Sequence, residues 1–170
     1  MAKKCIVNMV LSVDGFIADK EGNRDFSIKA NKQDKEFDVF YKSIDTVVMG
    51  RKTYDQIKSD FPQILKEKKV YVITHYLRQE EEGVSFIHEN IIDTIASLKN
   101  KAGKNIWVLG GSELVNLLMK ENLIDTFILT TAPLLIGDGK RLFHEENKPL
   151  ELSLEDLKRF DDYIKATYIR

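Results

Sequence analysis

The segment from Asn105 to Lys120 constrains the fold more than any other, because a buried strand, a tight turn and a helix follow one another directly in it. Residues 106–109 are continuously apolar, and Gly110 and Gly111 come next. The residues after the glycines place apolar side chains at the spacing of one helix face: Leu114, Val115, Leu117, Leu118 and Met119. The sequence therefore predicts a strand that enters a helix through a Gly-Gly turn.

This Gly-Gly turn has two interpretations. Glycines let the backbone bend sharply and let another group approach it closely. The first turn of the following helix presents unpaired N–H groups at the positive end of the helix dipole, where phosphates often bind. Close packing of helix against sheet explains the pair equally well, since the third spaced glycine of the dinucleotide fingerprint is absent.

A second turn of the same kind strengthens the phosphate interpretation. Residues 46–49 predict a strand, Gly50 follows, and a helix is expected from about Thr53 to Ser59. Arg51 can hold a phosphate with two N–H donors, Lys52 adds positive charge, and the Thr53 hydroxyl can donate a further hydrogen bond. The alternative is two solvated cations and a capping threonine, but two such turns after two buried strands favour a phosphate site.

The remaining pattern predicts strands that alternate with helices. Further strands are expected at residues 5–13, 70–73, 85–88 and 126–132, and a further helix at 91–99. Such alternation indicates an α/β protein with a mostly parallel sheet, and the apolar alternation after Leu150 predicts a final antiparallel hairpin around 158–162. The carboxyl ends of the strands then collect Gly50, Thr74 and Gly110 at the edge where such sheets bind ligands.

A helical pattern also covers residues 31–44, where an apolar side is formed by Phe37, Phe40, Tyr41 and Ile44. Asp34, Glu36 and Asp38 lie near its start. An acidic stretch at that place suits the helix dipole and is typical of a solvated face. The alternative is that one of the three carboxylates points into a pocket.

Composition excludes several classes of protein. The 170 residues have the length of one domain, which we expect to span 1–170, and the net charge of −1 provides no general attraction for nucleic acid or an anionic membrane. No stretch approaches the roughly 18 apolar residues of a membrane-spanning helix. The single cysteine, Cys5, favours a reducing cytoplasm, and His75 has no neighbouring cysteine or aspartate that would indicate a metal site.

Five motifs stand in a characteristic order along the chain: S-V-D-G-F-I-A (12–18), D-T-V-V-M-G-R-K-T-Y (45–54), V-Y-V-I-T (70–74), W-V-L-G-G (107–111) and A-P-L-L-I-G-D-G-K-R-L-F (132–143). The chain thereby resembles the dihydrofolate reductase fold family. It is most similar to the branch that holds the reductase domain of the riboflavin-biosynthesis deaminase/reductase and bacterial stand-alone proteins. The resemblance implies a three-layer α-β-α sandwich with a mixed, mostly parallel sheet and an antiparallel C-terminal hairpin.

The resemblance also implies NADPH as cofactor. In the family, the Gly-Arg-x-Thr turn binds cofactor phosphates, the hydroxyl-bearing end of the next strand reads the adenosine 2′-phosphate, and the Gly-Gly turn lies against the pyrophosphate and nicotinamide. The implied cofactor-binding residues are Ala18, Gly50, Arg51, Lys52, Thr53, Thr74, His75, Leu109, Gly110, Gly111, Ser112 and Glu113, with Arg78 as a further candidate.

For the chemistry, the resemblance implies hydride transfer from the cofactor to a small heteroaromatic or sugar-linked substrate. Folate reducers anchor the pterin with a helix carboxylate beside a threonine hydroxyl, which here implies Glu36 and Thr130 as catalytic residues. A shifted alignment would choose Asp34. The family also implies a homodimer.

The substrate expected from the closest branch is 5-amino-6-(5-phosphoribosylamino)uracil. The chain lacks the Pro-Gly-Arg segment of folate reducers, which is replaced by Lys66 to Lys69. A Ser112-Glu113 pair stands where folate reducers have a cofactor-contacting arginine. Dihydrofolate is therefore the alternative substrate, and a module that binds NADPH without turnover is a further one.

Overall fold

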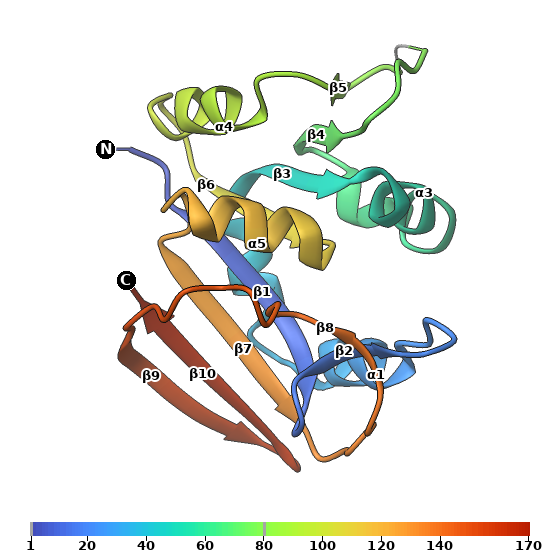
Figure 1. Cartoon of the computed structure of the whole chain (residues 1–170), viewed down its shortest axis with the longest axis vertical. Helices are drawn as coiled ribbons and strands as arrows, with labels where there is room; N and C mark the ends of the chain where they lie inside the picture. The colour runs from blue at the N-terminus through green and yellow to red at the C-terminus, as the bar shows by residue number, and fades with distance from the viewer. Residues whose placement is uncertain (1, 80) are drawn as a thin grey trace.

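The computed structural model describes residues 2–79 and 81–170, and in these residues eight strands form one twisted sheet in the order β5-β4-β3-β6-β1-β7-β10-β9 (Figure 1). The strands are β1 (Cys5–Ser12), β3 (Ile44–Gly50), β4 (Lys69–Ile73), β5 (Val84–Ile87), β6 (Asn105–Gly110), β7 (Thr126–Ala132), β9 (Ser153–Phe160) and β10 (Tyr163–Ile169). All neighbours from β5 to β7 pair in parallel, whereas β10 and β9 add to β7 as antiparallel strands. The predicted mixed sheet and C-terminal hairpin are confirmed.

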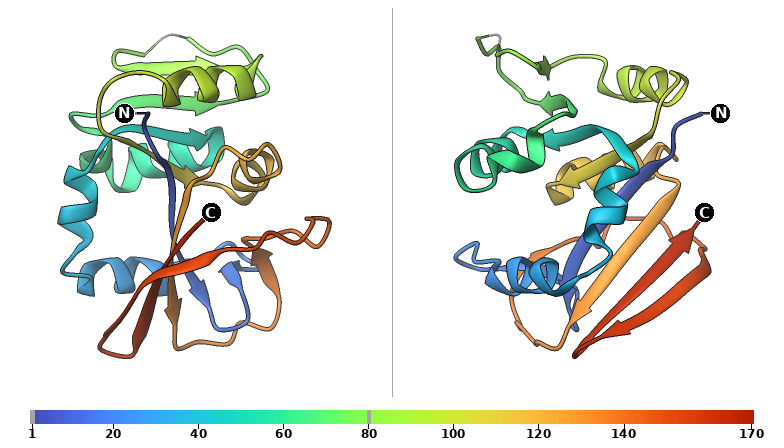
Figure 2. Two further views of the ribbon diagram at one scale, coloured as in Figure 1. Left: turned by 90° about the vertical axis from the view of Figure 1, so that its left-hand side faces the viewer. Right: turned by 180° about the vertical axis from the view of Figure 1, so that it is seen from behind.

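Helices cover both faces of this sheet (Figure 2). One face carries α4 (Ile91–Lys99) and α5 (Ser112–Lys120), and the other carries α1 (Asp25–Gln33), α2 (Phe37–Lys42), α3 (Arg51–Asp60) and the 3₁₀ turn η1 (Pro62–Leu65). Side chains of α4 and α5 pack with Val7, Val108 and Phe127 in one core cluster, and the aromatic side chains of α2 pack with Trp107 in another. The result is the predicted three-layer α-β-α sandwich.

The prediction of a single helix over residues 31–44 is wrong, because the structure divides this region between α1 and α2 and assigns Ile44 to β3. The break lies at Asp34, whose carboxylate accepts a hydrogen bond from the backbone N–H of Glu36 at 3.0 Å and ion-pairs with Lys165 at 2.8 Å. A side chain that bonds its own backbone two residues on competes with helical hydrogen bonding. The part of the predicted apolar face that lies in α2 is retained, because Phe37 and Phe40 both pack against Trp107.

A small second sheet joins two segments that lie far apart in the sequence. Strand β2 (Phe16–Asp19) pairs in antiparallel fashion with β8 (Gly139–Arg141). A Cβ atom at Gly139 would lie 2.2 Å from the carbonyl oxygen of Ala18, so only glycine allows this approach. The sheet holds the segment after β1 against the loop after β7.

No helix within residues 2–79 and 81–170 combines the length and the apolar character needed to cross a membrane.

Candidate active site

Three strand ends lie side by side at the carboxyl edge of the sheet. In the strand register Gly50, the last residue of β3, is opposite Ile73 of β4, and Met49 is opposite Gly110 of β6. Thr74 follows Ile73 directly, so the residues that the sequence grouped by strand position are neighbours in space. A Cβ atom at Gly50 would lie 3.8 Å from the backbone nitrogen of Gly111, which brings the two glycine turns into contact.

Two helices begin at this contact, and both are suited to an anion. Gly50 precedes α3 and Gly111 precedes α5, and neither helix has a side-chain cap on its first N–H groups. The N–H groups of a first helical turn have no intrahelical partner and carry positive partial charge. The peptide bond between Gly110 and Gly111 is cis, and Gly110 has a φ of 115°, a backbone conformation that favours glycine.

Two side chains approach the Gly-Gly turn from different elements. A Cβ atom placed on Gly111 would lie 3.5 Å from Lys140 Nζ and 3.8 Å from Thr53 Oγ1. Thr53 comes from α3 and Lys140 from β8. The turn is therefore a shallow cradle in which a backbone surface without side chains lies beside an ammonium group and a hydroxyl group, a donor set that suits a phosphate.

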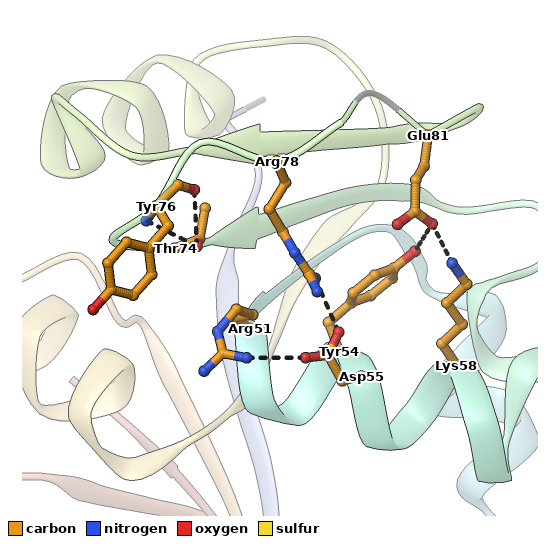
Figure 3. A network of polar contacts seen from close by, with 8 residues as sticks. All are labelled: Arg51, Tyr54, Asp55, Lys58, Thr74, Tyr76, Arg78 and Glu81. Atoms are coloured by element: carbon orange, nitrogen blue, oxygen red, sulfur yellow. Dashed lines mark hydrogen bonds and ion pairs between the residues drawn. The ribbon is translucent and has the colours of Figure 1, made fainter.

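A chain of charged groups extends from this cradle over α3 (Figure 3). Arg51 and Arg78 both donate to the carboxylate of Asp55, with N–O distances of 3.3 and 2.9 Å. On the same helix, Tyr54 donates to Glu81 at 2.7 Å, and Lys58 pairs with the same carboxylate oxygen. One carboxylate thus pairs with both arginines, whose side chains are 39% and 31% exposed.

Thr74 and His75 directly follow β4 at the carboxyl edge of the sheet. The Thr74 hydroxyl accepts a hydrogen bond from the backbone N–H of Tyr76 at 3.2 Å, which closes a tight turn after the strand. Thr74 is buried and His75 is exposed. In the described part of the chain, no group of three or more His, Cys, Asp or Glu side chains is arranged to hold a metal ion.

A cavity of about 400 Å³ lies under α1, α2, α3 and η1, against the face of β1 and β6. Its wall is mainly apolar and aromatic, with polar groups at few places. The apolar lining is Met9, Val10, Ile17, Ile28, Phe37, Tyr41, Ile57, Phe61, Ile64, Trp107 and Leu109, and the polar lining is Asn8, Arg24, Ser27, Asn31, Lys32, Asp38, Thr53 and Gln63. Such a cavity is suited to a flat ring that is recognised by a few polar contacts.

The cavity and the glycine cradle adjoin each other at Thr53 and Leu109. Thr53 lines the cavity and also lies 3.8 Å from the Cβ position of Gly111, and Leu109 lines the cavity one residue before the Gly-Gly turn. Ala18, a buried residue of β2, pairs with Lys140, whose Nζ lies near the Gly-Gly turn. The structure thus brings together Ala18, Gly50, Thr53, Leu109, Gly110 and Gly111.

Among residues 2–79 and 81–170, Asp38 is the only acidic residue in the lining of this cavity. Arg24 lies across the cavity on the α1 side, where its guanidinium donates to the Gln56 side chain at 2.5 Å and its pKa is lowered by burial. With Lys32, these groups place two cations and one anion around a mainly apolar chamber.

Glu36 and Thr130, the expected catalytic residues, do not line the cavity. Glu36 pairs with Lys158 at 2.6 Å and with Lys165 at 3.1 Å. Hydrogen bonds from Lys158 and then from Lys165 hold the pKa of the Glu36 carboxyl below its ordinary value, so the group stays ionised near neutral pH. Thr130 is buried in β7 opposite Lys165.

Asp34, the residue chosen by the shifted alignment, is also tied to Lys165, at 2.8 and 2.9 Å from the two carboxylate oxygens. These ion pairs fasten the segment between α1 and α2 to the C-terminal hairpin. Asp34 and Glu36 therefore hold two helices in place over the cavity, whereas Asp38 faces it.

Sequence reasoning gave Lys140 no specific role. Its position depends on the β2–β8 pairing, which joins segments more than 100 residues apart. The K-R pair after two glycines was the only local signal, and it is equally typical of a solvated loop.

Comparisons with known proteins match this arrangement. The family model described as the RibD C-terminal domain matches residues 3–166. The chain belongs to the RibD C-terminal domain family. The Bacillus subtilis (strain 168) protein YwjB, described as uncharacterized, is 37% identical over 173 residues that cover 100% of this chain and 99% of YwjB.

Solved structures show the same fold. A Shewanella sp. PV-4 protein, described as a candidate riboflavin biosynthesis protein, is 31% identical with a TM-score of 0.83, over 100% of this chain and 99% of its own. Dihydrofolate reductase from Enterococcus faecalis, solved with NADP(H), has a TM-score of 0.72 at 18% identity, over 98% of this chain and 96% of its own. The predicted dihydrofolate reductase-like fold and riboflavin-branch relationship are confirmed.

Proposed function

We propose that this RibD C-terminal domain protein is an NADPH-dependent reductase of a small heteroaromatic or sugar-linked substrate. The observation that carries the proposal is that the two sites adjoin, because Thr53 of the glycine cradle also lines the apolar cavity and Leu109 of the lining directly precedes the Gly-Gly turn. A cofactor whose phosphates lie in the cradle can extend its reactive ring to the cavity. The E. faecalis enzyme, which has the same fold, binds NADP(H).

The residues of the cradle fit the cofactor chemically. Gly111 leaves the backbone open to a phosphate, and Lys140 and Thr53 supply charge and a hydroxyl donor beside it. Gly50 to Thr53 and Gly110 to Glu113 are the two loops expected to hold the pyrophosphate. We expect Thr74, His75, Arg51 and Arg78 to bind the adenosine 2′-phosphate, as the family resemblance implies. When bound, NADPH supplies the hydride.

The protein's contribution is then mainly positioning. The apolar walls exclude water from the cavity, and the packing of α2 against Trp107 fixes its inner end. Holding a reactant ring beside the cofactor ring converts an encounter of two molecules into a reaction within one complex. No covalent nucleophile is needed.

The substrate-anchoring carboxylate has two candidates. Glu36, with Thr130 beside it, is the assignment implied by folate reducers. Asp38 is the second candidate, and the cavity lining favours it because Asp38 faces the chamber while Glu36 is paired with Lys158. We expect Asp38→Asn to lower kcat or raise KM while cofactor affinity is retained, and Glu36→Gln to act mainly on thermal stability. The reverse pattern would restore the Glu36 assignment.

The proposed substrate class is that of 5-amino-6-(5-phosphoribosylamino)uracil. The Shewanella protein described as a candidate for riboflavin biosynthesis is similar over its whole length, and Arg24 and Lys32 supply positive charge to the cavity wall that suits a phosphate-bearing chain. A pterin is the alternative substrate.

A substrate panel with NADPH tests this proposal. The loss of nicotinamide absorbance measures the oxidation of NADPH in the presence of aminopyrimidine, aminouracil ribosyl phosphate or dihydrofolate substrates. Turnover of the aminouracil compound in preference to dihydrofolate is expected. NADPH binding without turnover of any compound would favour a module that has kept the fold and lost the chemistry.

A further inference from the structure

One buried side chain, Asn116, ties the segment after β8 to α5. Asn116 lies in α5 and is 2% exposed. Its Nδ2 donates to the carbonyl oxygen of Ser112 at 2.6 Å and to that of Leu142 at 2.7 Å. Its Oδ1 accepts hydrogen bonds from the backbone N–H of His144 at 3.1 Å and from the side-chain amide of Asn147. Both donors and both acceptor sites of the carboxamide are used, so its orientation is fixed.

The two carbonyl groups that Asn116 binds come from two segments that contribute to the glycine cradle. Ser112 is the first residue of α5 and directly follows Gly111. Leu142 directly follows β8 and lies two residues after Lys140. One carboxamide thus links the first turn of α5 to the strand that carries the ammonium group of the cradle.

Asn116 carries the hydrogen bonding between α5 and this segment. Within residues 2–79 and 81–170, every hydrogen bond between α5 and residues 139–147 involves Asn116. Elsewhere, β8 is held by its pairing with β2, and the Leu142 N–H donates to the Gly15 carbonyl oxygen at 3.4 Å. Leu142 also packs in the core cluster with side chains of α5, but apolar packing is non-directional. The exact placement of β8 against α5 therefore depends on this carboxamide.

Lys140 depends on the placement of β8, because its side chain is exposed and long. Its Nζ lies 3.5 Å from the Cβ position of Gly111. Holding a lysine side chain in one conformation costs entropy, so the side chain does not correct for a displaced backbone without loss. A shift of about 1 Å in β8 is enough to lengthen a hydrogen bond from the ammonium group beyond its usual range.

We propose that Asn116 is a positioning residue that holds β8 so that the Lys140 ammonium group stays beside the Gly-Gly turn, where it binds a cofactor phosphate. The inference rests on the proposed function, since it takes the cradle as the phosphate site of NADPH. Asn116 is buried and acts on the cofactor only through Lys140. Its effect on cofactor affinity therefore disappears when the Lys140 side chain is removed.

Calorimetric titration with NADPH tests this dependence in four forms of the protein: unmodified, Asn116→Ala, Lys140→Ala and the double variant. An exposed ion pair contributes up to about fivefold to affinity, so Lys140→Ala is expected to bind NADPH about fivefold more weakly. Asn116→Ala is expected to lose about three- to fivefold, because Lys140 is no longer held in place. Added to Lys140→Ala, the same replacement is expected to change the affinity by less than about 1.5-fold.

Thr46→Val is the control for a general loss of buried hydrogen bonds. The buried Thr46 hydroxyl accepts from Lys3 Nζ at 3.1 Å and donates to Asp45 at 2.7 Å, near the end of β3 opposite to the cradle. This variant is expected to melt at a lower temperature but to keep its NADPH affinity. Alanine suits a helix interior, so Asn116→Ala is expected to fold. Asn116→Ser, which keeps one hydrogen-bond donor, gives the same comparison if the alanine variant does not fold.

Equal losses from Asn116→Ala with and without the Lys140 side chain would show a purely structural role and overturn the inference. An unchanged affinity in Asn116→Ala or in Lys140→Ala would overturn it as well. In each of these cases the unmodified protein still binds NADPH, so the proposed function stands. Absence of NADPH binding to the unmodified protein contradicts the proposed function, and the inference with it.

Discussion

Replacing Arg51 by alanine tests the proposed 2′-phosphate contact without disturbing the core. The Arg51 side chain is 39% exposed, and its ion pair with Asp55 is the longer of the two that this carboxylate makes, 3.3 Å against 2.9 Å for Arg78. An exposed pair of this kind contributes below about 1 kcal/mol to stability. We therefore expect the variant to fold with an almost unchanged melting temperature.

The effect on cofactor binding should be larger and selective. A charge-assisted hydrogen bond contributes about 1.5–3 kcal/mol, which corresponds to roughly 10–150-fold in affinity. We expect an effect at the lower end of this affinity range, because Arg51 is partly solvated and Arg78 remains paired with Asp55 as a second cation. We predict that NADPH binds about tenfold more weakly to Arg51→Ala, whereas NADH, which lacks the 2′-phosphate, changes less than about twofold.

Isothermal titration of both cofactors measures this difference. Lys120→Ala is the charge-matched control, because Lys120 is exposed at the far end of α5 and should leave both affinities unchanged. Equal losses for NADPH and NADH in Arg51→Ala would refute a 2′-phosphate contact. Equal losses in the control would show that net charge alone sets the affinity.

Three further predictions concern other parts of the structure. Gly111→Ala adds a methyl group 3.5 Å from Lys140 Nζ, which is an ordinary contact, so little stability should be lost. The methyl group would occupy the proposed phosphate position, and calorimetry should show about tenfold weaker NADPH binding. Unchanged affinity would contradict the assignment of the cradle as the phosphate site. The pKa of Asp14 is lowered from 3.8 to about 2, first by the Ser12 hydroxyl and also by backbone N–H groups of the 136–137 segment. The ionised Asp14 carboxylate therefore stabilises the fold above about pH 4, and this stabilisation is lost as the pH falls through 2. In Ser12→Ala, NMR titration should return the Asp14 pKa toward 3.8, and no rise would contradict this cause. The homodimer stays a prediction. Leu157 is 59% exposed on β9, so Leu157→Glu should convert the expected dimer into a monomer, as measured by light scattering. A monomeric unmodified protein would contradict the predicted dimer.

The local elements of the site were predictable because each has a strong short-range signal. The strand, Gly-Gly and helix sequence of residues 105–120 corresponds to β6 and α5, and Gly50 separates β3 from α3 as expected. Glycines at strand ends and continuous apolar runs act through the backbone and through burial, so they are visible without knowledge of the tertiary structure.

Features that depend on long-range contacts were not predictable. At the break between α1 and α2, the Asp34 carboxylate accepts the local Glu36 N–H and also pairs with Lys165, 131 residues away, a contact that the local sequence does not reveal. The same ion pairs take Glu36 away from the cavity and leave Asp38 there, a choice that helical spacing alone could not make. Lys140 reaches the Gly-Gly turn only through the β2–β8 pairing.

The central claim, that one NADPH molecule extends from the glycine cradle to the apolar cavity, is tested most directly by the emission of Trp107. The indole lines the cavity together with Thr53 and Leu109, so a nicotinamide ring bound there would lie close enough to accept its excitation energy. Titration with NADPH should quench the tryptophan emission saturably, with matching nicotinamide emission that is absent in Trp107→Phe. No saturable change at any NADPH concentration would contradict the account.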